Sequence, residues 1–338
     1  MFRMKQMAVS AVLLLVAASA MASNFRGADQ VYMQVAGHVG VFASDVWVSN
    51  LSTADSVSVS IIYTPQGQGQ APQYFDNAFT LRPSERKEII DFFPTILGLN
   101  SGIGSLIFNA CKQGADCIGT QDDQGNSINF RDIAVFSRIY ATQAGPPVQT
   151  NGQAFPGTPW YHFVSSRQSA NGLGRVFVSG IRSTGVNNPR QPGTYRTNIG
   201  LMNASQYSTT TIVVKLFNGS TAQQIGSDFS FVLGPLNSVQ SNVSTMFSAF
   251  AAGATSTNAY VTIEQTANVP TNDAPATCLP DGCPGFLAFG SVLDNQNDAP
   301  TTLETVYEKG LSGPALDAIY GTASVPKSNI RRAVKRAH

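Results

Sequence analysis

The chain contains two stretches of sequence that align with each other without a gap. The segment around Asn50, DVWVSNLSTADSVSVSIIYTPQG, matches the segment around Asn203, NIGLMNASQYSTTTIVVKLFNG, each residue aligning with the one 153 positions later. Downstream, FTLRPSE matches FVLGPLN, and IAVFSRIY matches LAFGSVLD. A period of about 150 residues is the size of a domain, not of a solenoid repeat. The sequence therefore predicts two similar domains related by internal duplication.

Short alternating segments dominate both stretches. Val57, Val59 and Ile61 alternate with serines, and a similar alternation covers 212–216. A period of two indicates strands with one buried face, and clusters of Gly, Pro and Asn separate these strands. We expect an all-β protein of two tandem immunoglobulin-like β-sandwich domains, with closed barrels as the competing architecture. Short helical turns are expected at 89–97 and 245–252.

Composition changes divide the chain into five regions. They are a signal peptide at 1–22, a first sandwich at 29–143, a Gly/Pro-rich connector at 144–173, a second sandwich at 174–301, and a tail at 302–338 with a short helix and a basic disordered end.

The connector contains four aromatic residues within nine positions. An idle linker has no need of them, so we expect the connector to pack against the sandwiches and fix their orientation. Phe155, Trp160 and Tyr161 are also the candidates for an aromatic platform that binds a ligand.

The N-terminus has the pattern of a secretory signal peptide. Arg3 and Lys5 precede the apolar run AVSAVLLLVAASA, and Ala20-Met21-Ala22 offers a cleavage site between small residues. The apolar run is short for a membrane span, although an uncleaved anchor is the alternative. We expect cleavage near Ala22, a secreted, periplasmic or cell-surface location, and no transmembrane anchor.

The distribution of charge argues against nucleic acid as a partner. The chain has 21 basic and 20 acidic residues, but two basic residues lie in the signal peptide and five in the last twelve positions. The remaining body has 14 basic against 20 acidic residues, and an acidic body repels phosphates. The basic end, KSNIRRAVKRAH, is a solvated terminus or a contact with an anionic surface.

The four cysteines form two closely spaced pairs. Cys111 precedes Cys117, and Cys278 precedes Cys283, each pair lying between matching segments of its repeat. An even count and an exported chain predict one local disulfide in each domain, each stabilising by about 2 kcal/mol in the chain-entropy account. A zinc site built from both pairs is the alternative.

The sequence offers little that could carry catalysis. The three histidines are not spaced as metal ligands on one element, and the chain contains no G-x-S-x-G, H-E-x-x-H or P-loop motif. We therefore predict a non-enzymatic protein with no catalytic residues and no cofactor.

Two polar motifs have local interpretations. The loop QDDQGNSINFRD places Asp122, Asp123 and Asn126 together, an oxygen-rich composition that suits calcium but lacks the EF-hand register; an exposed insert is the alternative. Asn-x-Ser motifs at Asn50 and Asn203 occupy the same position in the two repeats. We expect these asparagines to cap the backbone at a strand end.

The motifs of the second repeat follow a recognisable order. GRVFVSGIR, YRTNIGLMNAS, TIVVKLFNGS, FVLGPLNSVQ and FLAFGSVLDNQNDAPT resemble a β-sandwich module that recurs in tandem in secreted bacterial proteins, in which an FRTNIGLVN-type strand precedes a Val/Thr-rich strand. The resemblance covers about 29–301, and the first copy departs from it with DVWVSNLS. It implies an accessory or structural role and transfers no catalytic residue.

Three hypotheses of function follow. The leading one is an exported, non-enzymatic interaction, adhesion or envelope-structural protein whose partner is an unknown protein or polysaccharide at the cell surface. The second is a secreted carbohydrate-binding or enzyme-accessory module that uses the aromatic connector. The third is a self-assembling surface subunit that associates through edge strands.

Overall fold

The computed structural model describes residues 27–117, 128–141, 152–167, 174–184, 192–251, 255–296 and 300–307. This part of the chain folds into four antiparallel sheets with a few short helical turns, which confirms the all-β prediction. No helix within it has the length and apolar character to cross a membrane. The predicted signal peptide, the calcium candidates Asp122, Asp123 and Asn126, and the basic end of the tail lie outside the described residues.

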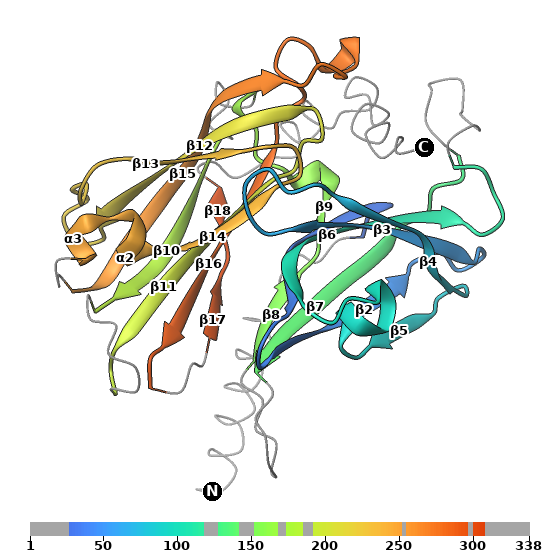
Figure 1. Ribbon diagram of the computed structural model, residues 1–338, viewed down its shortest axis with the longest axis horizontal. Coiled ribbons are helices and arrows are strands. Elements are labelled where there is room, and N and C mark those ends of the chain that lie inside the picture. Colours follow the sequence, from blue (N-terminus) through green and yellow to red (C-terminus); the bar gives the residue numbers. More distant parts are fainter. Residues whose placement is uncertain are drawn as a thin grey trace, which may run out of the picture.

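The first sandwich contains β1 to β9, on the right in Figure 1. Its larger sheet has the order β4-β3-β6-β1-β9 and its smaller sheet the order β5-β2-β7-β8. The strands are β1 Gln30–His38, β2 Phe42–Asn50, β3 Val57–Pro65, β4 Gln73–Leu81, β5 Arg86–Ile89, β6 Gly102–Lys112, β7 Ile133–Ala141, β8 Gly152–Pro156 and β9 Thr158–Pro159. A π-helical turn, η1 Phe93–Leu97, lies within the helical segment predicted at 89–97, and a 3-10 turn, η2 Trp160–His162, follows β9.

The second sandwich contains β10 to β18. Its larger sheet has the order β13-β12-β15-β10-β18 and its smaller sheet the order β14-β11-β16-β17. The strands are β10 Arg175–Ser183, β11 Tyr195–Asn203, β12 Ser208–Asn218, β13 Phe229–Leu233, β14 Ser238–Asn242, β15 Ser256–Pro270, β16 Phe286–Asp294, β17 Pro300–Leu303 and β18 Val306–Tyr307. The helical turns are α2 Val243–Met246, α3 Ser248–Ala251 and η4 Ala276–Cys278, and the first two match the turn predicted at 245–252.

The two sandwiches share one strand order, although it is not the immunoglobulin order. Both bounds of β2 and β11 differ by the 153 residues of the sequence alignment. An immunoglobulin domain pairs its first strand with its second and its last with its sixth. Here the first strand of each unit pairs with the sixth, and the seventh with the second. The immunoglobulin-like part of the prediction is therefore not confirmed, and a duplicated origin stays a prediction.

Alternation along the strands builds each core. Val46 and Val48 of β2 face the interior of the first sandwich, and Ile199 and Leu201 of β11 occupy the matching positions in the second. Burial of these side chains is the main favourable contribution to folding, at about 1.5–3 kcal/mol for each fully buried aliphatic side chain.

The connector and the start of the tail add edge strands to the sandwiches. β8 pairs with β7, and β9 with β1, so the connector extends both sheets of the first sandwich. In the same way β17 pairs with β16, and β18 with β10. The structural units thus differ from the expected division at 144–173 and 302–338. Strands of two to five residues carry too little alternation to be recognised, because partner strands supply the hydrogen bonds that define them.

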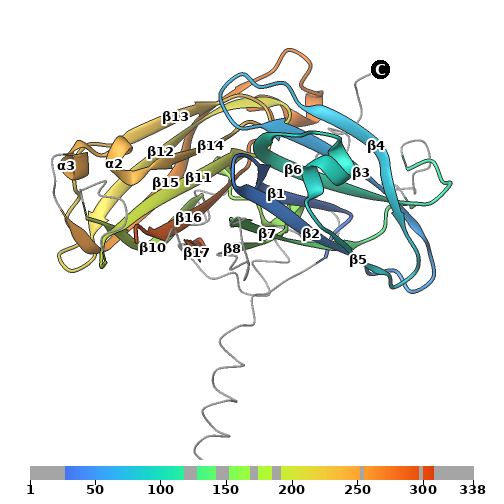
Figure 2. The ribbon, with the colours of Figure 1, turned by 60° about the horizontal axis from the view of Figure 1, so that its bottom comes forward.

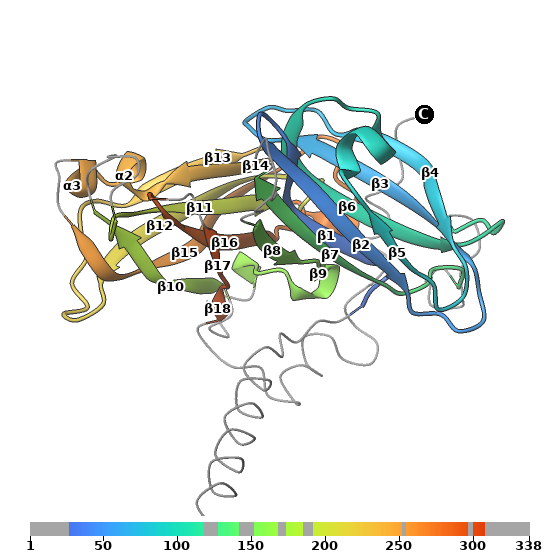
Figure 3. The same ribbon diagram turned by 90° about the horizontal axis from the view of Figure 1, so that it is seen from below.

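The two sandwiches lie side by side in Figure 2 and bury an apolar interface between them. Met202, Leu287 and Phe289, on the outer face of the β11–β16 sheet, join the same buried cluster as the first core. The β3–β4 loop reaches across as well: Gly67 N–H donates to the Ser238 carbonyl at 2.9 Å, and Gly69 N–H donates to Asn237 Oδ1 at 2.7 Å. Figure 3 shows β8 beside β17 at this boundary.

Candidate functional site

The aromatic residues of the connector are buried against the protein. Phe155 and Trp160 are each only 5% exposed. Trp160 Nε1–H donates to Asp29 Oδ1 at 3.1 Å, and the Phe155 ring meets Phe289 edge to face with centroids 5.1 Å apart. The side chain of Tyr161 lies outside the described part of the chain.

The prediction of a ligand platform at Phe155 and Trp160 is therefore corrected. A ligand stacks on a ring only if a ring face is open to solvent, and both rings are covered. The expectation that the connector packs against the sandwiches does describe what is seen, since Phe155 joins the two units. Sequence alone could not separate these roles, because an aromatic cluster has the same composition whether it packs in the interior or forms an exposed binding platform.

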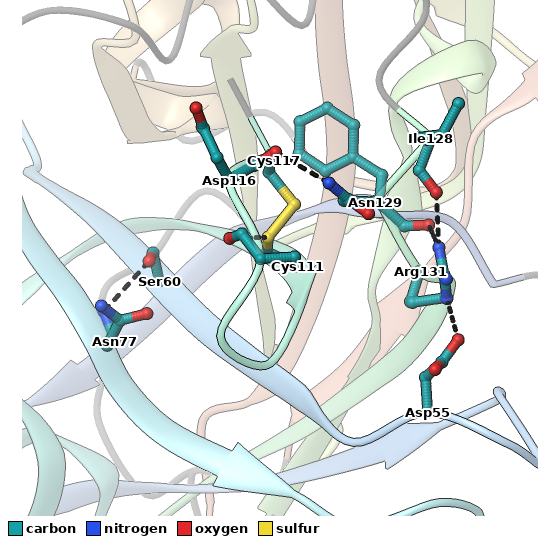
Figure 4. Close-up of a disulfide and its surroundings, with 11 residues drawn as sticks. Asp55, Ser60, Asn77, Cys111, Asp116, Cys117, Ile128, Asn129 and Arg131 are labelled. Atoms are coloured by element: carbon teal, nitrogen blue, oxygen red, sulfur yellow. Dashed lines mark hydrogen bonds and ion pairs between the residues drawn. A yellow bond between two sulfur atoms is a disulfide. The ribbon is translucent and has the colours of Figure 1, made fainter. Parts of the chain in front are cut away.

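Both predicted disulfides form in the structure. Cys111 and Cys117 are joined with Cα atoms 5.9 Å apart (Figure 4), and Cys278 and Cys283 with Cα atoms 4.6 Å apart. All four sulfurs are thus used, which leaves no thiolate for the alternative zinc site. Both bonds lie on the connection between the sixth and seventh strands, but Cys111 is still inside β6, whereas Cys278 follows β15.

Charged groups close the base of the first disulfide loop. Arg131 Nε–H donates to Asp55 Oδ2 at 2.6 Å, and Lys112 Nζ lies 3.0 Å from Asp55 Oδ1. The hydrogen bond from Lys112, followed by that from Arg131, lowers the pKa of Asp55. Asn129 donates to the Asp116 carbonyl at 2.9 Å, as Figure 4 shows. These polar contacts hold the base of the disulfide loop together.

The asparagines of the Asn-x-Ser motifs cap strand ends, as predicted. Asn50 Oδ1 accepts from Ser52 N–H at 2.9 Å, and Asn203 Oδ1 accepts from Ser205 N–H at 3.0 Å. Their amide groups donate to carbonyls across the sandwich, two for Asn50 and three for Asn203. Both side chains are buried, so they hold loops together and are inaccessible for modification in the folded protein.

A polar cluster at one end of the first sandwich brings a histidine, two carboxyl groups and a tyrosine together. His38 Nδ1 lies 2.7 Å from Asp91 Oδ1, and Asp91 N–H donates to Asp45 Oδ1 at 2.9 Å. Tyr140 Oη–H donates to the same Asp45 oxygen at 3.0 Å. Burial, together with the bond to Asp45, raises the pKa of Tyr140 to about 12. The tyrosine is thus a donor that holds the carboxylate in place.

Hydrolytic catalysis would need a nucleophile beside this histidine. A His–Asp pair activates a serine or cysteine only when the hydroxyl or thiol bonds the other ring nitrogen. Within the described ranges, the His38 side chain is hydrogen-bonded to Asp91. Those ranges also contain no group of three His, Cys, Asp or Glu side chains arranged for a metal ion.

The outer face of the larger sheet in the second sandwich carries an aromatic row that the sequence analysis missed. Phe177, Tyr260 and Phe217 lie on β10, β15 and β12, three neighbouring strands, and all are half-buried. The Phe217 and Tyr260 rings stack with centroids 5.1 Å apart and an interplanar angle of 11°, and Tyr260 is 6.2 Å from Phe177. The signal was present: each residue occupies the solvent-facing phase of its strand, where polar side chains are usual.

Charges of both signs border this aromatic row. The Arg175 guanidinium lies over the Phe177 ring, 5.5 Å from its centroid. Lys215 Nζ lies 3.1 Å from Glu264 Oε1, and this hydrogen bond is the main cause that raises the lysine pKa. An aromatic centre with a polar rim is the usual anatomy of a protein–protein interface. We call the surface formed by Phe177, Tyr260 and Phe217 the aromatic face.

Comparisons with known proteins leave the function open. No family model matches the chain, and no curated protein matches it. Among solved structures, one chain described as "Biofilm associated protein - B domain" aligns over 82% of this chain and 80% of its own length, at 9% sequence identity and a TM-score of 0.18. A TM-score that low does not indicate a shared fold.

Proposed function

We propose that the protein is an exported, non-enzymatic interaction protein of the cell surface or envelope, and that the aromatic face is its contact surface. The observation that carries the proposal is a comparison within the molecule. On the first sandwich, Tyr32 occupies the position of Phe177 and is only 3% exposed, with its ring packed edge to face on Phe163 of the connector. Ser105, on the same face, lies 3.5 Å from the Leu236 carbonyl of the second sandwich. The same face of this fold thus already serves as a protein interface once.

The stacking of the rings favours a protein partner over a sugar. Sugars bind aromatic platforms through open ring faces, but the stacking of Phe217 on Tyr260 covers one face of each ring. Arg175, Lys215 and Glu264 lie at the rim of this surface. Such a surface suits aromatic and aliphatic side chains framed by polar groups.

Export is supported by features at two levels. The N-terminal sequence has the charge pattern, the apolar run and the small residues of a signal peptide. Both cysteine pairs form disulfides, which persist in oxidising compartments.

The non-enzymatic role is supported by how the reactive groups are used. The cysteines are bonded, Asp55 anchors a loop, and Asp91 and Asp45 belong to a cluster closed by Tyr140. These contacts give the cysteine and carboxyl groups a structural role.

Cell fractionation and a binding assay test this proposal. The tagged full-length protein should appear outside the cytoplasm with its leader removed, and the labelled mature protein should bind producer cells that lack it. Tyr260→Lys should weaken that binding, whereas Ile128→Lys, at an exposed apolar residue of the first sandwich, should not. Retention of the protein in the cytoplasm would contradict the proposal, and so would turnover of a hydrolase substrate that His38→Ala abolishes.

A further inference from the structure

The internal interface joins two different faces of the same fold. The first sandwich contributes the outer face of its larger sheet, where Tyr32 of β1 and Ser105 of β6 are buried. The second contributes the outer face of its smaller sheet, with Met202 and Phe289. Contacts cross between the two: Ser105 Oγ–H lies 3.5 Å from the Leu236 carbonyl. We call these surfaces the large-sheet face and the small-sheet face.

Each sandwich has both kinds of face, so one of each is left outside the interface. Register defines the equivalent positions: Tyr32, Ile107 and Ile62 lie side by side across β1, β6 and β3, as Phe177, Thr262 and Lys215 do across β10, β15 and β12. By the same register Ser105 corresponds to Tyr260, and Thr64 to Phe217. The aromatic face is therefore the large-sheet face of the second sandwich.

The small-sheet face of the first sandwich is the other remaining surface. Trp47 pairs with Phe136 across β2 and β7, as Gly200 pairs with Phe289 across β11 and β16. The Trp47 and Phe136 rings lie 5.5 Å apart and are half-buried. Leu51, at the end of this strand, is 49% exposed, whereas its counterpart Ala204 is buried in the interface.

Both remaining faces thus have aromatic centres and charged rims. Glu88 of β5 lies beside Trp47, and Arg86 lies beside Ser49; the aromatic face has Arg175, Lys215 and Glu264. Aromatic residues dominate the energetics of interfaces, and opposite charges at a rim guide two surfaces into one register.

We propose that the aromatic face of one molecule docks on the Trp47 face of a second copy of this chain, repeating between molecules the packing that joins the two sandwiches within one. The contact uses two different surfaces, so it is heterologous: it leaves one free face at each end and propagates into a chain or closes into a ring. This inference names the partner of the contact surface and rests on the proposed function for that surface alone.

Two single substitutions test the arrangement in the full mature protein. Trp47→Lys removes one face and Tyr260→Lys the other, both at half-buried positions on outer surfaces. Each should weaken self-association in sedimentation velocity at least about tenfold, with the melting temperature little changed. An equimolar mixture should form a dimer that cannot extend, because each variant keeps the face that the other has lost.

Several results would overturn the proposal. The wild type could stay monomeric at its highest soluble concentration, or the mixture of the two variants could give no dimer. One variant could also still dimerise alone, which would mean that the contact is symmetric. Loss of assembly in Val232→Lys but not in Tyr260→Lys would assign the contact to the edge strand β13 instead. If association fails while cell binding persists, only this inference falls.

Discussion

The two sandwiches have the same strand order, yet equivalent outer faces meet different surroundings. Tyr32 of the first is 3% exposed, whereas its counterpart Phe177 is half-buried at the surface. On the smaller sheets the second unit has the buried side chain, since Phe289 is buried whereas its counterpart Phe136 in the first unit is half-buried. The burial of the inner faces therefore follows from the fold of each sandwich. The burial of an outer face depends on whether the other sandwich packs against it.

The largest expected difference between the units lies at this interface. Phe289→Ala should lower the free energy of unfolding by about 3–5 kcal/mol, because it opens a cavity beside Phe155 and Gly200. Phe136→Ala, at the equivalent half-buried position, should cost about 1 kcal/mol. Urea denaturation measures both, and equal losses would mean that the interface adds little.

A smaller difference is expected at the capping asparagines. Asn203→Ala leaves three carbonyls and one N–H without their partner, while Asn50→Ala leaves two carbonyls and one N–H. We expect losses of about 3 and about 2 kcal/mol respectively. The control is Asn218→Ala, because the native Asn218 side chain caps an exposed turn. This substitution should cost less than about 1 kcal/mol. The opposite ranking, measured by urea denaturation, would contradict this account of the caps.

The disulfides should contribute almost equally to the two units. They close loops with sequence separations of 6 and 5 residues, so the chain-entropy account gives about 2 kcal/mol for each. Replacing either pair by serine and comparing urea midpoints under oxidising conditions measures this. Reduction of the wild type should raise its intact mass by four hydrogens. A much larger loss at Cys111 and Cys117 would show that the polar cluster around Asp55 depends on that bond.

The smallest expected difference is a dependence on pH that the first sandwich has and the second lacks. Asp55 is ionised and paired, whereas Ser208 takes its place in the second unit. The pKa of Asp55 is lowered on folding, so as pH falls this carboxyl is protonated in the unfolded chain before it is protonated in the folded protein. The pair therefore stabilises above the usual value of 3.8 and loses its effect as pH falls through the lower folded pKa. Asp55→Asn should flatten the acid limb of the stability curve, and an unchanged limb would argue against the pair.

The fold was more predictable than the contact surface, for a physical reason. Alternation around Val57 and Ile212 reports one buried face, which is a local property of a strand. Phe177 and Tyr32 are similar aromatic residues on equivalent strands. The residues near them in sequence do not indicate which of the two side chains is buried. Phe155 and Trp160 show the same limit, since their burial depends on partners more than a hundred residues away.

The sequence by itself determined the all-β class, the 153-residue correspondence between the units, both disulfide pairs and the capping role of Asn50 and Asn203. All of these depend on spacing along the chain. Only the tertiary structure decided the strand order, the inclusion of β8, β9, β17 and β18 in the sandwiches, and which outer face is buried. Those features depend on pairing between distant segments, where the free energy comes from area buried on contact, and a linear pattern does not specify that contact.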